Sequence, residues 1–198
     1  MSAPIIAGIA AFVVAILSAV ASYLSNQRLQ RRQERLHRIN RQLSELYGPL
    51  LALSEAGRRS YREYLKKHRV GSFTNPDLPA SAEALALWQL WMSKVLQPIN
   101  DKIFDLIVGH ADLLIGDEMP DFFLEFCAHK AGFDVTIAQW EAGDRSRHFS
   151  VIAHPGERMN EYIRESFAYL KAAQANLIRS IDAPGAPAKP FRLTRGGR

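Results

Sequence analysis

The chain has a single cysteine, Cys127, among its 198 residues. One cysteine excludes an intrachain disulfide and agrees with a reducing compartment such as the cytoplasm. Cys127 stands between two apolar residues, as a small core residue does, and lies two positions before His129. Side chains two positions apart on a helix point in different directions, so the sequence does not pair this thiol and this imidazole as nucleophile and base.

The motifs that identify common reaction classes are also absent. The sequence has no glycine-rich phosphate loop, no pair of zinc-binding cysteines, no nucleophile elbow and no kinase motif. The paired Glu-x-x-His spacing of di-iron helical bundles is absent, and so is His-Glu-x-x-His. We therefore expect no cofactor, and a binding or structural role is favoured over an enzyme.

No stretch alternates β-branched and polar residues for long enough to build a sheet, and the nearest candidate, Phe149 to Ile152, is short. Apolar residues instead recur at spacings of three and four, which predicts helices. We expect an all-α fold, in which a transmembrane helix continues into a basic juxtamembrane helix and a bundle of about five cytoplasmic helices follows. The expected divisions are 1–3 as an extracytoplasmic N-terminus, 4–24 as the transmembrane helix, 25–47 as the juxtamembrane helix, 48–182 as the bundle and 183–198 as a disordered basic tail.

Charge is missing from the mostly apolar run between Pro4 and Leu24. At about 1.5 Å of rise per residue, this run spans roughly 31 Å as a helix, which matches the hydrocarbon core of a bilayer. A cleaved signal peptide is the alternative, because the small residues Ala19 to Ala21 precede Ser22 as at a cleavage site. The run is longer than the apolar part of most signal peptides, and no Lys or Arg precedes it, so a retained anchor is favoured.

Basic residues follow the apolar run with few acidic ones among them. Residues 1–70 hold 12 Lys or Arg and 4 Asp or Glu, whereas residues 71–182 hold 9 and 16. The positive-inside rule therefore places the N-terminus outside and the rest of the chain in the cytoplasm. Because the basic charge gathers beside the membrane, it favours contact with the lipid bilayer, including anionic head groups, over nucleic acid. The residues expected to make this contact are Arg28, Arg31, Arg32, Arg35, Arg38 and Arg41.

Two patterns in this region suggest helix association. Alanines recur every four residues from Ala7 to Ala19, which lets two membrane helices approach closely, although an ordinary lipid-facing helix explains them as well. Leucines recur every seven residues from Leu29 to Leu50, but the stripe is shorter than a coiled coil usually requires. Self-association and packing on the chain's own domain both remain open.

Glycine and proline divide the rest of the chain. Gly48-Pro49 predicts the end of one helix and the start of another, which we expect to fold back as a helical hairpin. Val70 to Pro79 predicts a loop, Ser81 an N-cap and Pro98 a kink or break. Further helices are expected at about 50–68, 82–95, 99–108, 120–140 and 156–181.

Four strings carry a resemblance to known proteins: Leu43-Ser44-Glu45-Leu46-Tyr47-Gly48-Pro49-Leu50, Leu90-Trp91-Met92, His110-Ala111-Asp112-Leu113-Leu114 and Phe126-Cys127-Ala128-His129. The chain resembles a group of bacterial proteins of uncharacterised function that have one N-terminal membrane helix and a helical body. The resemblance runs over most of the chain, from the anchor to Ile181. It implies a protein of the bacterial inner membrane, and it implies no activity and no catalytic residue.

His110, Asp112 and His129 are the candidate metal ligands. Imidazole and carboxylate groups bind zinc or iron, and facing helices of a bundle can bring them together. In the alternative, which the missing ligand spacings favour, His110 caps or hydrogen-bonds near a helix C-terminus and His129 is a partly buried polar residue of the core. Glu141 to Glu157 is the longest polar segment of the body, and a solvated connector is its simplest interpretation.

Aromatic residues at helical spacings, namely Trp88, Trp91, Trp140, Phe122 and Phe123, predict core packing, and any of them exposed on one patch would serve as an anchor for a partner. The favoured functional hypothesis is an interaction, scaffold or regulatory module at the cytoplasmic face of the membrane, which binds another protein or itself. It predicts an exposed apolar or acidic patch on residues 81–181. The alternative is a metal-dependent enzyme or sensor that uses His110, Asp112 and His129.

Overall fold

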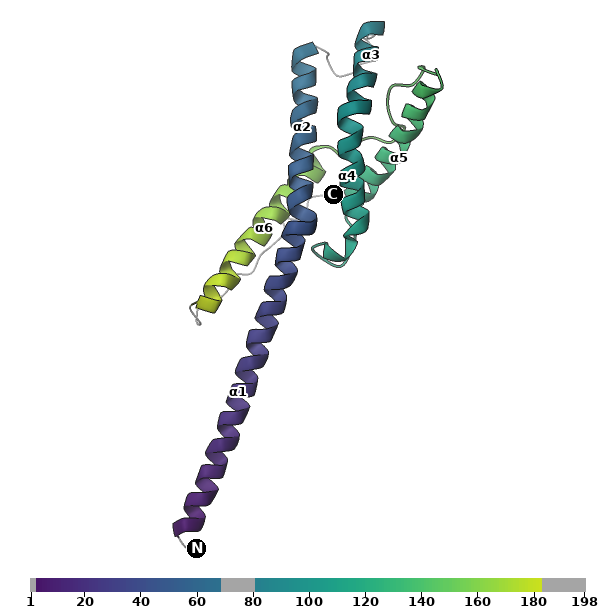
Figure 1. Cartoon of the computed structure of the whole chain (residues 1–198). Helices are drawn as coiled ribbons and strands as arrows, with labels where there is room; N and C mark the ends of the chain where they lie inside the picture. Colours follow the sequence, from purple (N-terminus) through teal and green to yellow (C-terminus); the bar gives the residue numbers. More distant parts are fainter. Residues whose placement is uncertain (1–2, 69–80, 183–198) are drawn as a thin grey trace. The chain divides into compact units, whose positions relative to one another are not determined.

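The computed structural model describes the backbone of residues 3–68 and 81–182 and the side chains of residues 11–68 and 81–179. The predicted loop at residues 70–79 and the tail at 183–198 lie outside these residues. Within them the structure is helical and contains no strand, so the all-α prediction is confirmed (Figure 1). The elements in order are α1 (Ala3–Arg41), η1 (Gln42–Tyr47), α2 (Gly48–His68), α3 (Ala82–Trp91), η2 (Met92–Leu96), α4 (Gln97–Gly109), η3 (Ala111–Leu113), α5 (Asp121–Glu141) and α6 (Glu157–Asp182).

The chain divides into two compact units. Among the described residues, one comprises 3–40 and 173–182, where the amide of Gln174 donates a hydrogen bond of 2.7 Å to the side-chain oxygen of Asn40. The other, residues 41–172, is called the helical body below.

The predicted transmembrane helix falls within α1. Among the residues whose side chains the structure describes, no helix is long and apolar enough to cross a membrane. Residues 4–10 of the predicted span lie outside that set. From Phe12 to Leu24, the large apolar side chains of α1 are exposed, with Phe12 at 68% and Leu17 at 62%.

Gly48 and Pro49 do not break the helix, so the predicted helical hairpin is wrong. The backbone stays helical from α1 through the π turn η1 into α2, and Gly48 itself has φ −66° and ψ −56°. The N–H of Gly48 bonds to the carbonyl of Leu43, five residues back. Proline lacks an N–H and its ring clashes with the carbonyl four residues before it, and a wider π turn at that point accommodates both.

Pro98 follows a second π turn in the same way. The N–H of Gln97 bonds to the carbonyl of Met92, and the helix continues from α3 through η2 into α4. The predicted kink or break at Pro98 is therefore a π turn within a continuous helix. In both places the residue before the proline closes the π turn.

Side chains of the first π turn hold the segment that follows α4. The amide of Gln42 donates to the carbonyl of Leu113 at 2.9 Å, and the hydroxyl of Tyr47 accepts the N–H of Ile115 at 3.0 Å. The Tyr47 hydroxyl also lies 3.2 Å from that of Tyr162 on α6. Burial, and then Tyr162, raise the pKa of Tyr47, so it stays protonated. The turn thus ties α4 and α6 to the start of the body.

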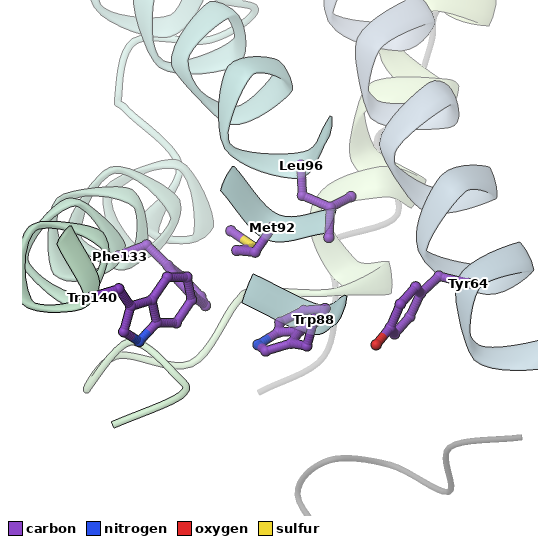
Figure 2. Packing of buried hydrophobic residues seen from close by; sticks show 6 residues of the cluster. All are labelled: Tyr64, Trp88, Met92, Leu96, Phe133 and Trp140. Carbon is purple, nitrogen blue, oxygen red and sulfur yellow. The ribbon is translucent and has the colours of Figure 1, made fainter. Parts of the chain in front are cut away.

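A cluster of buried apolar residues joins α2, the α3–η2–α4 helix and α5. Figure 2 shows Tyr64 of α2 beside Trp88, with Met92 between Trp88 and the pair from α5, Phe133 and Trp140. The indole of Trp88 lies 5.7 Å from the ring of Tyr64, a distance typical of aromatic contacts. Core packing is confirmed for Trp88, Trp140 and Phe123, whereas Trp91 is only partly buried.

Candidate functional site

The helical body contains a cavity of about 690 Å³. Cavities that bind small molecules usually have volumes of roughly 300–1,000 Å³ and mainly apolar walls. Here the walls come from α2, the α3–η2–α4 helix, α5, the segment before α6 and the first turn of α6. The apolar lining includes Leu53, Tyr61, Trp88, Met92, Leu96, Ile99, Ile103, Phe126, Phe133 and Met159.

Gly57 contributes to the size of this cavity. It lies on the face of α2 that also presents Leu53 and Tyr61, at the helical spacing of four. A Cβ at Gly57 would lie 3.5 Å from Cγ2 of Ile99, which is an ordinary contact. The absence of a side chain there therefore leaves space in the cavity, and no close approach of backbones requires the glycine.

Residues 147–152 are called the strap below, and residues 149–152 of it line another part of the wall. The predicted solvated connector is only partly correct, because residues 142–147 are exposed but Phe149 packs against the core cluster. Side chains of α3 and α5 donate hydrogen bonds to four backbone carbonyls of the strap: Trp140 to Arg147 (2.6 Å), Trp88 to His148 (3.0 Å), Thr136 to Phe149 (3.3 Å) and His129 to Ile152 (2.6 Å).

Gly132 lets the strap approach α5. A Cβ at this position would clash with the side chain of Ser150, whose hydroxyl accepts the N–H of Ile152 at 3.2 Å. Backbone carbonyls buried without partners are costly, and here tryptophan, threonine and histidine side chains supply those partners. The strap is thus a fixed part of the cavity wall.

Two histidines line the cavity together. The rings of His129 on α5 and His154 before α6 are perpendicular, with centroids 5.1 Å apart. His129 is 8% exposed and also contacts Phe133, whereas His154 lies edge-to-face against Phe126. Burial lowers the pKa of His129, and burial followed by the charge of His129 lowers the pKa of His154 to about 4. Both imidazoles are therefore neutral near pH 7.

Arg58 and Glu157 bring opposite charges to the cavity wall. Glu55 accepts hydrogen bonds from Arg58 and, at 3.1 Å, from Arg164, which also donates to Glu157. The hydrogen bond from Arg58 is the main cause that lowers the pKa of Glu55, and that from Arg164 is the main cause for Glu157. Arg59, which is largely exposed, adds a third cation at 3.7 Å from Glu55. The Nε of Arg58 is buried and has no hydrogen-bond partner in the described part of the chain.

Acidification from about pH 6.5 to pH 4.5 is expected to destabilise the body through His154. The unfolded chain binds a proton there below pH 6.5, whereas the folded chain does so only near pH 4, so the free energy of unfolding falls across this window. The residue as a whole is exposed, so the effect is smaller than full burial would give. The pKa values of Glu55 and Glu157 are lowered from 4.5, so these carboxylates lose their contribution to the stability of the body only as the pH falls below 4.5.

Thermal unfolding at several pH values measures this effect. We expect Tm to fall between pH 6.5 and pH 4.5. In His154→Phe the fall should be shallower, and the fall that remains is the contribution of His129. A Tm that is constant over this range in the unmodified chain would contradict the assignment of neutral imidazoles.

The three predicted metal ligands do not share one site. His110 is the C-cap residue that follows α4, and its Nδ1 lies 3.9 Å from a carboxylate oxygen of Glu45. Asp112 lies 3.8 Å from Arg41, while His129 donates its Nδ1 proton to the strap. Across residues 11–68 and 81–179, no group of three or more His, Cys, Asp or Glu side chains is placed to hold a metal ion. The alternative placements, a helix C-terminus for His110 and the core for His129, are confirmed.

Cys127 and the arginines that follow the apolar run are the remaining residues singled out from the sequence. Cys127 is partly buried, and burial raises the pKa of its thiol. Arg28 to Arg38 lie on α1, and Arg41 pairs with Glu45 at 3.1 Å. Contact of these arginines with lipid stays a prediction.

Sequence reasoning missed the cavity residues Gly57, Arg58, His154 and Glu157. The one available signal is Gly57, because a glycine between Leu53 and Tyr61 leaves a gap in an otherwise apolar helix face. His154 precedes Pro155 in a long polar segment, and nothing in its spacing relates it to His129.

Comparison with known proteins yields no match: no protein-family model, no curated protein and no solved structure matches the chain. The resemblance to bacterial membrane proteins therefore stays a prediction. The features of the chain that bear on its function are the cavity and the distribution of charged and apolar residues along the sequence.

Proposed function

We propose that the chain is a membrane-anchored binding protein whose helical body holds an apolar small molecule. In this proposal α1 crosses the bacterial inner membrane with the N-terminus outside, and the body acts as a regulatory module at the cytoplasmic face. The observation that carries the proposal is the cavity of about 690 Å³ with mainly apolar walls. The cavity is partly open to the surface, and its volume falls in the range of sites that bind small molecules.

The anchor is supported by the exposed surface of α1. The side chains of Phe12, Val14, Leu17 and Val20 are each half exposed or more, and Tyr23 and Leu24 follow them. Contiguous exposed apolar surface is unfavourable in water and typical of membrane contact. The arginines from Arg28 onward begin where this surface ends, as expected for a cytoplasmic flank.

Quenching of tryptophan fluorescence by a bromoalkane tests the binding function. All three tryptophans, Trp88, Trp91 and Trp140, lie in the helical body, so the emission reports on the body and not on α1. With the full chain in lipid nanodiscs, we expect 1-bromododecane to quench the emission saturably, because it enters the cavity beside Trp88.

Two single substitutions locate the quenched residue. Trp88→Phe is expected to remove most of the saturable quenching, whereas Trp91→Phe, which changes a tryptophan outside the cavity lining, keeps it. Quenching that rises linearly with probe and is equal in both variants would contradict binding in the cavity.

Protein interaction is the second candidate function, and the outer face of α5 favours it. Leu124, Ala131, Val135 and Ala138 are exposed there at spacings of seven, four and three, so they form one apolar stripe. The stripe carries no charge and suits a second copy of this helix. A dimer in nanodiscs that Val135→Glu converts to a monomer would support this role, and a monomeric unmodified chain would contradict it.

A further inference from the structure

The two cavity histidines have fixed and opposite hydrogen-bonding roles. Nδ1 of His129 lies 2.6 Å from the carbonyl oxygen of Ile152. A carbonyl oxygen can only accept, so Nδ1 carries the proton, and in a neutral ring Nε2 is then an acceptor. Nδ1 of His154 accepts the N–H of Gly156 at 2.9 Å, so its proton resides on Nε2, which is a donor.

Neither Nε2 atom has a hydrogen-bond partner in the described part of the chain, where the bonds of both rings run through Nδ1. His129 is nevertheless more than nine-tenths buried. Nε2 of His129 is itself not a fully buried atom, and His154 is an exposed residue, so both nitrogens are open to a partner that enters the cavity. The cavity therefore presents one acceptor and one donor from adjacent rings, with centroids 5.1 Å apart.

The cavity lining carries one cation, Arg58, and one anion, Glu157, so it offers no net charge to an ionic ligand. Arg58 is paired with Glu55, and Glu157 is paired with Arg164. A charged head group would lose its hydration without gaining an uncompensated opposite charge, which is unfavourable in an apolar cavity. An uncharged ligand pays no such cost.

We infer that the ligand is an uncharged, largely apolar molecule with a hydroxyl group that binds between His129 and His154. The hydroxyl donates its proton to Nε2 of His129 and accepts the Nε2 proton of His154. This inference rests on the proposed binding function and specifies the polar group that the cavity selects.

Other head groups fit this pair less well. A carboxylate or phosphate only accepts, so it places negative charge against the lone pair of His129. A methyl ether also only accepts, and it leaves that nitrogen without a partner. A hydroxyl satisfies both nitrogens with a single oxygen, since it has one donor and two acceptor sites.

Three photoreactive probes with the same alkyl chain of about twelve carbons, a length suited to a cavity of this size, test the inference. They carry the diazirine at the same position and end in a hydroxyl, a methyl ether or a carboxylate. Each is added to the full chain in lipid nanodiscs near neutral pH, and after illumination the adducts are mapped by peptide mass spectrometry. Adducts on α5 and on residues 149–160 report the cavity, and adducts on α1 report probe in the bilayer.

We expect the alcohol to label the cavity peptides about three- to tenfold more than the ether, the difference that one neutral hydrogen bond provides, and the carboxylate to label them least. His154→Phe removes the donor but keeps the bond between His129 and the strap. It is expected to lower alcohol labelling by a similar factor, whereas His110→Phe, at a histidine outside the cavity, leaves it unchanged.

Equal or stronger labelling by the carboxylate would overturn the inference and leave the binding function intact, with Arg58 as the head-group site. Equal labelling by alcohol and ether would also overturn it. Adducts on α1 alone, with none on the cavity peptides for any probe, would contradict the binding function itself. The two failures are therefore distinguishable in one data set.

Discussion

Replacing Gly57 by phenylalanine is expected to abolish saturable quenching by 1-bromododecane in the full chain. The residue lines the cavity, and the first added atom meets only Ile99 at an ordinary 3.5 Å. The backbone of α2 therefore has no reason to move, and the ring occupies space that the ligand otherwise fills. Because glycine is a poor helix former, we expect the free energy of unfolding to be unchanged or up to about 1 kcal/mol higher.

Gly109→Phe is the matched control. Gly109 is also a helical glycine of the body, at the end of α4, and an added Cβ there meets no atom within 4 Å. This variant should bind the bromoalkane as the unmodified chain does. Saturable quenching that persists in Gly57→Phe, with the fold retained, would show that the probe binds elsewhere.

Gly48→Ala is expected to destabilise the helical body by about 1–3 kcal/mol, the cost of forcing extra atoms into a packed site. An added Cβ would clash with the carbonyl oxygen of Leu43, which is also the acceptor of the N–H of Gly48. Backbone on both sides fixes this contact, so no rotation of a side chain relieves it. The same π turn holds Tyr47, which is fully buried and bonded to Ile115.

Urea unfolding followed by tryptophan emission measures this loss, because every tryptophan lies in the body. Gly57→Ala is the control, since it adds the same methyl group in α2 where the contact is ordinary, and it should unfold at the same or a slightly higher urea concentration. If Gly48→Ala is as stable as Gly57→Ala, then the π turn does not require glycine.

The helical class was predictable from sequence because it depends on local periodicity. Residues such as Trp88, Met92 and Leu96 recur at the helical spacing, and the structure packs them into one cluster. Ser81 caps α3 as predicted, with its hydroxyl accepting the N–H of Ala84 at 3.2 Å.

The continuity of the helix at Gly48-Pro49 was not predictable in the same way. Glycine followed by proline is a common signal for a helix end, and the identical residues also suit a π turn that removes the clash of the proline ring. The outcome depends on Tyr47 and Gln42, whose partners at residues 113–115 are remote in sequence. Tertiary contacts thus decided between two local structures.

The candidate site depends even more on distant contacts. The strap has the composition of a solvated loop, and only hydrogen bonds from Trp88, Thr136, Trp140 and His129 make it part of the cavity wall. His154 adjoins His129 for the same reason. Patterns along the chain report which faces are apolar, but they do not report where facing side chains leave space.

The central claim is that the cavity of the helical body holds an uncharged apolar molecule, and the small molecules that copurify with the full chain test it most directly. The chain and its Gly57→Phe and Gly109→Phe variants are taken from their native membrane in nanodiscs, extracted and compared by mass spectrometry. The account predicts one uncharged, hydroxyl-bearing apolar compound in near-stoichiometric amount with the unmodified chain and Gly109→Phe, and its loss from Gly57→Phe. Extracts that contain the same compounds in the same amounts for all three chains would contradict it.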